Sequence, residues 1–175
     1  MSAALVDLAQ ALGDDDFGAA LLADVALAFA QAKDFASAEK IARLIKGQET
    51  SEHLRVIAEA EAKIGEAQRA LVLLQEARKA AFIYEFPTQQ AQSIAAVAAT
   101  METVDREAAV EAWETAVRTA TPAQDAGGTD GPEASGVLFE AVEAFLRLAR
   151  ESEAHRVAAQ IKLPSLRERA SALCE

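Results

Sequence analysis

Apolar residues recur three and four positions apart through most of the chain, which is the spacing of an α-helix with one buried side. From Leu21 to Ala81 this pattern predicts two consecutive pairs of helices, interrupted at Asp34 and Gly65. The four predicted helices cover residues 21–33, 35–45, 52–64 and 67–81. The sequence has no long alternating runs of β-branched residues, so we expect an all-α protein.

The two predicted helix pairs are similar to each other. Ala38 lies early in the second helix of the first pair, and Ala70 takes the same place 32 residues later. A small residue at this place lets two antiparallel helices approach closely. Ala109 and Ala154 follow similar polar breaks downstream, which gives intervals of 32, 39 and 45 residues. Self-similarity of this kind is typical of an α-helical repeat array, and the drifting period indicates a degenerate one.

These alanines, together with Ala26, Phe29 and Ala42 around the first of them, resemble the pattern of tetratricopeptide-like helical repeats. The resemblance covers roughly residues 20–162. The chain departs from that pattern because Glu61 takes the place of Phe29 in the second pair and no proline closes each unit. The resemblance implies a right-handed solenoid of about four antiparallel hairpins. It also implies that the concave face, made by the first helix of each hairpin, binds a peptide or a protein.

The whole chain, residues 1–175, is expected to form a single α-helical repeat domain, because it is long enough to bury a core of its own. We expect a short first helix that ends at Gly13 and covers the open end of the array. The predicted parts are an N-terminal capping helix at 1–16, three hairpins at 17–120, a flexible loop at 121–135, and the last hairpin with a C-terminal helix at 136–175.

The predicted loop is rich in glycine and proline and is long for a compact domain. It is either a mobile linker or a loop that binds a partner. After it, Pro164 breaks the chain, and Ser165 with Glu168 has the spacing of a capping box that would open the last helix. The only tryptophan, Trp113, shares a helical stripe with two valines, which predicts a core position.

The net charge of −11 disfavours binding to nucleic acid, because an acidic chain repels phosphate. A single cysteine, Cys174, fits a reducing compartment. The sequence has no apolar run of about 18 residues and no charged-then-apolar leader, so no membrane association is expected. These features together predict a soluble cytoplasmic protein.

Candidate chemistry is sparse. His155 follows Glu151 by four residues and could form an acid–base pair or half of a metal site, but no other ligand is spaced to join them. The sequence contains no glycine-rich phosphate loop, no Cys-x-x-Cys and no nucleophile elbow. We therefore expect no enzymatic activity, no cofactor and no metal. Residues 89–93 form a polar, uncharged patch that is either a hydrogen-bonding surface for a peptide or ordinary helix surface.

The leading hypothesis is a scaffold or adaptor that binds a protein or peptide partner. The resemblance places six residues on the first helices that would form the binding face: Gln31, Arg55, Glu59, Lys63, Glu143 and Arg147. One alternative is an acidic mimic that occupies a basic site on a partner, because residues 1–30 carry five acids and no base. Another is an accessory subunit of an enzyme. Homo-oligomers are plausible for an array with open ends.

Overall fold

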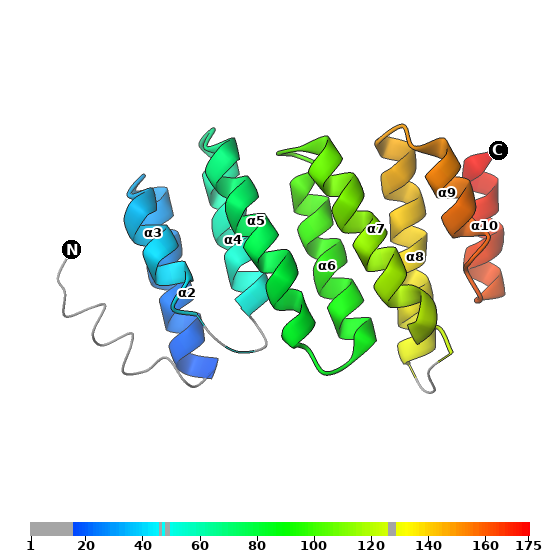
Figure 1. Ribbon diagram of the computed structural model, residues 1–175, viewed down its shortest axis with the longest axis horizontal. Helices are drawn as coiled ribbons and strands as arrows, with labels where there is room; N and C mark the ends of the chain where they lie inside the picture. Colours follow the sequence, from blue (N-terminus) through cyan, green and yellow to red (C-terminus); the bar gives the residue numbers. More distant parts are fainter. Residues whose placement is uncertain (1–15, 46, 48–49, 126–128) are drawn as a thin grey trace. The chain divides into compact units, whose positions relative to one another are not determined.

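The computed structural model describes residues 16–45, 47, 50–125 and 129–175. Every regular element within these residues is a helix, so the predicted all-α class is confirmed (Figure 1). The predicted N-terminal capping helix lies outside the described residues. The chain divides into two compact units, residues 1–83 and 84–175.

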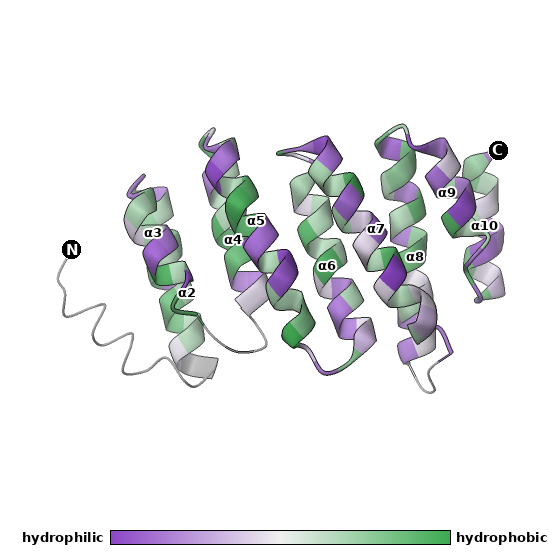
Figure 2. Ribbon diagram, in the orientation of Figure 1, coloured by the Kyte–Doolittle hydropathy of each residue, from purple (hydrophilic) through white to green (hydrophobic). Residues whose placement is uncertain are grey.

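Unit 1 contains α2 to α5 and a short 3-10 turn, η1. The elements are α2 (Asp16–Gln31), α3 (Phe35–Ala42), α4 (Thr50–Lys63), α5 (Ala67–Ala80) and η1 (Ala81–Ile83). Helix α2 packs against α3 and α4, and α4 packs against α5. The core between them is built from Leu22, Ile41, Ile57 and Leu73, each no more than 1% exposed. Figure 2 shows hydrophilic and hydrophobic residues alternating along α5, as expected for a helix with one buried side.

Unit 2 contains α6 to α10. The elements are α6 (Pro87–Met101), α7 (Arg106–Ala123), α8 (Asp130–Arg147), α9 (Glu151–Ala158) and α10 (Pro164–Cys174). Helix α6 packs against α7 and α8, and α8 also packs against α7, α9 and α10. Its core includes Ile94, Leu138 and Phe145, which are fully buried, and Trp113, which is 2% exposed. The core position predicted for Trp113 is therefore confirmed.

Three of the turns between paired helices share one geometry. Lys33, Gly65 and Ala149 follow the ends of α2, α4 and α8, and all three have a positive φ, at 63°, 91° and 57°. The amide of the next residue donates to a carbonyl five positions back, for example Asp34 N to Phe29 O at 2.9 Å. The other two acceptors are Glu61 O and Phe145 O. This pattern is a Schellman cap, which satisfies the carbonyls that a helix leaves free at its end.

The four alanines that define the sequence repeat occupy the same place in the structure. The amides of the four alanines, Ala38, Ala70, Ala109 and Ala154, each donate to the carbonyl of the N-cap residue just before their helix, at 3.0 Å. All four are 0% exposed. At the first and third of these helices the capping aspartate also accepts an amide, as Asp105 does from Ala108 at 3.0 Å. Because all four are fully buried, a larger side chain at this place would require the surrounding helices to move apart.

The predicted loop at 121–135 is wrong in its extent. Helix α7 continues to Ala123 and α8 already begins at Asp130, so only residues 124–129 separate them. Pro122 is tolerated in the last turn of α7, and Pro132 lies in the first turn of α8, where amides have no helical acceptor and a missing N–H costs little. Gln124 also joins the segments, because its side chain accepts from Ser135 at 3.0 Å and from the Lys162 amide at 2.8 Å.

The predicted capping box at Ser165 and Glu168 is also wrong. Helix α10 begins one residue earlier, with Pro164 in its first turn and Leu163 as the N-cap, and no side chain caps it. Proline is favoured at this place because its φ already matches the helix.

Candidate functional site

Helices α2 and α4 of unit 1 line a groove with a volume of about 520 Å³. Its lining residues are Leu27 and Gln31 from α2, Val56, Glu59, Ala60 and Lys63 from α4, and Ile64 just after α4. The α4 positions are three and four residues apart, so they form one stripe along the helix. The lining of the groove is therefore mostly apolar, with three polar residues that include one acid and one base.

The rim of this groove is held by a row of ion pairs on α4. Lys63 Nζ donates to Glu59 Oε1 at 2.7 Å, and Arg55 Nη1 donates to Glu59 Oε2 at 3.3 Å. Arg55 also binds Glu52 through two hydrogen bonds, at 2.6 and 2.8 Å. The hydrogen bond from Lys63, followed by the charges of Lys63 and Arg55, lowers the pKa of Glu59. The Lys63 side chain is 73% exposed, so it can exchange this surface pair for a ligand at little cost.

The six residues predicted to bind a partner are found in two separate places. Gln31, Glu59 and Lys63 lie together on the unit 1 groove, and Arg55 lies beside them through its bond to Glu59. Glu143 and Arg147 are on α8 in unit 2. Glu143 lines a smaller hollow with Phe139, Arg169, Ala172 and Leu173, in which the Arg169 guanidinium lies 4.6 Å from the centre of the Phe139 ring.

Arg147 is engaged by partners within its own unit. Its guanidinium donates twice to Glu102, at 2.9 and 3.2 Å, and Glu102 also accepts from Trp113 Nε1 at 3.0 Å. The hydrogen bond that Arg147 donates to Glu102 raises the pKa of Arg147. Two parallel bonds fix the planar guanidinium in one orientation. Arg147 therefore ties the end of α8 to the residue after α6, and it shares the acceptor Glu102 with Trp113.

Unit 2 has its own groove, with a volume of about 440 Å³, between α6 and α8. The lining residues are Gln92, Ala95, Ala96 and Ala99 from α6, Trp113 from α7, and Glu133, Gly136, Val137 and Glu140 from α8. Gln92 Nε2 donates to Glu133 Oε2 at 3.2 Å. Partial burial, with the nearby charge of Glu143, raises the pKa of Glu140.

The sequence did not reveal the α8 part of this groove. The signal was present, because Glu133, Gly136, Val137 and Glu140 have the same spacing as the groove positions of α4. It was hidden by the prediction that residues 121–135 form a loop, which placed Glu133 outside any helix. The polar patch at 89–93 was noticed, and Gln92 of that patch does line the groove.

Glu61 is the least expected polar residue of unit 1. It is 0% exposed, and neither carboxylate oxygen has a hydrogen-bond partner among the described residues. Burial, followed by the charge of Glu39, raises the pKa of Glu61 to about 7, while Arg69 acts in the opposite direction. Arg69 itself is paired with Glu39 at 2.6 Å. A buried carboxyl of this kind is a titrating group in the neutral range.

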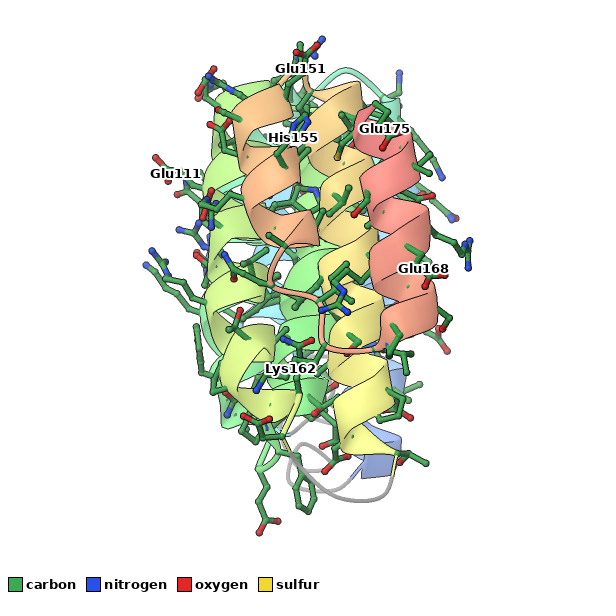
Figure 3. All side chains as sticks on the ribbon, turned by 90° about the vertical axis from the view of Figure 1, so that its right-hand side faces the viewer. Glu111, Glu151, His155, Lys162, Glu168 and Glu175 are labelled. Atoms are coloured by element: carbon green, nitrogen blue, oxygen red, sulfur yellow. The ribbon has the colours of Figure 1, made fainter. Side chains whose placement is uncertain are left out.

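The residues considered for acid–base or metal chemistry do not form a site. Figure 3 shows Glu151 at the start of α9, with His155 one turn further along. His155 Nδ1 lies 2.8 Å from the backbone oxygen of Glu151, so the contact involves the main chain rather than the carboxylate. Burial raises the pKa of the Cys174 thiol, which makes it a weaker nucleophile at neutral pH. Within the described ranges, no group of three or more His, Cys, Asp or Glu side chains could hold a metal ion.

Comparison with known proteins gives no relative. No family model, curated protein or solved structure matches the chain. Among the helices of the described residues, none is long and apolar enough to cross a membrane.

Proposed function

We propose that this chain is a non-enzymatic scaffold or adaptor that binds a peptide or protein segment along its first helices, as tetratricopeptide-like repeats do. One observation carries the proposal: each unit has a groove between two helices that begin successive helix pairs, α2 with α4 and α6 with α8. The second helix of each pair contributes only Trp113 to the two linings.

The two grooves are built on the same spacing. Residues 56, 59, 60 and 63 line the first on α4, residues 133, 136, 137 and 140 line the second on α8, and residues 92, 95, 96 and 99 line it on α6. Such a stripe gives a continuous strip of small or apolar side chains with polar neighbours. A strip of this kind suits a peptide that lies along it, because an apolar floor supplies affinity and a few polar groups fix the register.

The proposal includes the predicted right-handed solenoid of about four hairpins. Its support is the repeated local geometry: three Schellman caps, and a fully buried alanine at the same place after each of the four turns. Repeats that share such turns stack by burying the same faces against their neighbours. A solenoid uses the unpaired face of its first helices for binding, which agrees with the position of the two grooves.

Selection from a library of displayed peptides against the full chain tests this proposal. We expect a selected peptide to bind the wild type and to lose at least tenfold in affinity with the Gln31→Ala and Lys63→Ala double variant or with a variant of the unit 2 groove. The matched control is Gln75→Ala with Lys79→Ala, which removes the same two side-chain types from the exposed face of α5. The control should bind like the wild type.

Two outcomes would overturn the proposal. Failure to select any binding peptide would remove the scaffold function. Binding that is unchanged by both groove variants but disappears at moderate salt would favour the acidic-mimic alternative, because a long-range charge interaction is screened by salt.

A further inference from the structure

Gly136 lies inside α8, a helix of 18 residues, where glycine is a poor helix former. A Cβ atom built on Gly136 would meet nothing within 4 Å among the described residues, and its φ is not in the left-handed region. Neither close packing within the described protein nor backbone strain therefore explains a glycine here. Gly136 lines the unit 2 groove, so the missing side chain leaves that groove open to an external occupant.

The charges beside Gly136 indicate the chemistry of that occupant. Glu133 precedes it by three residues and Glu140 follows it by four, so both lie on the same side of α8. These are the charged side chains of the lining, and both are acidic. Gln92 donates to one oxygen of Glu133 and leaves the carboxylate able to accept further hydrogen bonds. Burial, followed by the charge of Glu143, raises the pKa of Glu140, and the positive charge of a bound cation would act in the opposite direction.

The rest of the groove suits an aliphatic chain. Ala95, Ala96 and Ala99 of α6 face Val137 and Gly136 of α8, and the Trp113 indole contributes to the lining. Lysine and arginine side chains have aliphatic stems that pack on apolar surfaces while their charged ends reach polar groups. The unit 1 groove differs, because Glu59 and Lys63 already pair with each other there.

We propose that the unit 2 groove binds a lysine or arginine side chain of the partner peptide, with its aliphatic stem over Gly136 and its cationic end between Glu133 and Glu140. This inference rests on the proposed function and adds the partner's chemistry to it. The cation would exchange its water for two carboxylates, one anchored by Gln92. A neutral side chain of the same shape would leave both carboxylates without that partner and would bind less well.

The test uses a short acetylated, amidated alanine peptide with one central arginine, and the same peptide with lysine or with neutral citrulline. Binding to the full chain is followed by the NMR signal of the indole N–H of Trp113, the only tryptophan. We expect saturable shifts with the two cationic peptides and binding roughly tenfold weaker, or weaker still, with citrulline. Gly136→Leu should abolish binding by filling the groove, and the Glu133→Gln and Glu140→Gln double variant should weaken it about tenfold or more.

Two control proteins separate binding from folding and from general charge. Gly136→Ala should fold at least as well as the wild type, because alanine is a better helix former and meets no neighbour. The Glu111→Gln and Glu168→Gln double variant removes the same charge from exposed positions on α7 and α10 (Figure 3) and should bind like the wild type.

Equal binding of the arginine and citrulline peptides, unchanged affinity in Gly136→Leu, or no shift with either cationic peptide would overturn this inference. A selected peptide that depends on the grooves but shows no preference for basic residues would refute it and leave the scaffold function standing. Absence of any selected peptide would refute the scaffold function itself.

Discussion

The buried carboxyl of Glu61 makes the stability of this protein depend on pH near neutrality. Glu61 O accepts the same cap hydrogen bond as Phe29 O and Phe145 O, so a glutamate stands where the two other Schellman-capped turns have phenylalanine. The titratable groups that act on it are Glu39 from α3, Arg43 just after α3, Arg69 from α5, and Glu66 at the turn. A phenylalanine in place of Glu61 would fill the same position and would have no group that ionises.

The size of this pH dependence follows from the pKa of Glu61. The pKa rises from 4.5 to about 7, a difference of roughly 2.5 units, and each unit corresponds to about 1.4 kcal/mol. The folded state therefore binds more protons than the unfolded state between these values. Stability from this group is fully present below pH 4.5 and is lost as pH rises through about 7, by up to about 3 kcal/mol.

The assay is urea unfolding of the wild type and of Glu61→Gln, followed by circular dichroism from about pH 5 to pH 8. Gln has nearly the same shape and cannot ionise, so the difference between the two proteins isolates Glu61. We expect the wild type to lose up to about 3 kcal/mol relative to Glu61→Gln over this range. Glu59→Gln is the control, because the pKa of Glu59 is lowered and its titration falls below the range.

A difference between wild type and Glu61→Gln that stays constant across the range would refute the reasoning. It would mean that water or a rearranged Arg69 solvates the carboxylate in the folded protein. A difference that grows in the opposite direction would mean that Glu61 is stabilised as a carboxylate.

Three further predictions concern the turns and the Trp113 network. Ala70→Leu should lower the free energy of unfolding in urea by about 1–3 kcal/mol, because a 0% exposed alanine leaves no room for three more carbon atoms. An unchanged free energy of unfolding would show that the helix pair can separate. Gly65 and Ala149 both have a positive φ, which glycine adopts more readily than alanine. Gly65→Ala should therefore lower the free energy of unfolding by about 1 kcal/mol, and Ala149→Gly should raise it by up to about 1 kcal/mol. Changes in the same direction for the two variants would contradict the cap geometry. Glu102→Ala should destabilise unit 2 by about 1–3 kcal/mol, because it leaves the buried indole N–H of Trp113 unpaired. Unfolding followed by the fluorescence of Trp113 measures this change. An unchanged free energy of unfolding would show that the hydrogen bond between Trp113 and Glu102 does not stabilise unit 2.

Local periodicity predicted the features that depend on near neighbours in sequence. The helices of unit 1 and the four buried alanines follow from apolar spacing and from the short polar turns, which act over a few residues. The predicted loop at 121–135 was wrong because its two prolines, Pro122 and Pro132, lie inside helices: proline is tolerated in the first turn of a helix and, here, in the last. Whether a proline ends a helix therefore depends on the turn of the helix in which it lies.

Features that depend on distant contacts were not predictable in the same way. Arg147 was predicted to lie on the binding face, but its guanidinium binds Glu102, which is 45 residues away in the sequence. The exchange of Phe29 for Glu61 between the two predicted pairs was visible in the sequence, yet its complete burial depends on α3 and α5 packing around it. The unit 2 groove likewise depends on α6 and α8 lying side by side.

Chemical-shift mapping of a selected peptide on the isotope-labelled full chain tests the central claim most directly. The claim predicts that perturbed backbone amides concentrate on α2 and α4, on α6 and α8, or on both, and include the lining positions 56–63 or 133–140. Perturbations confined to α3, α5, α7 and α9 would contradict it, because the peptide would then bind the opposite helices of each pair.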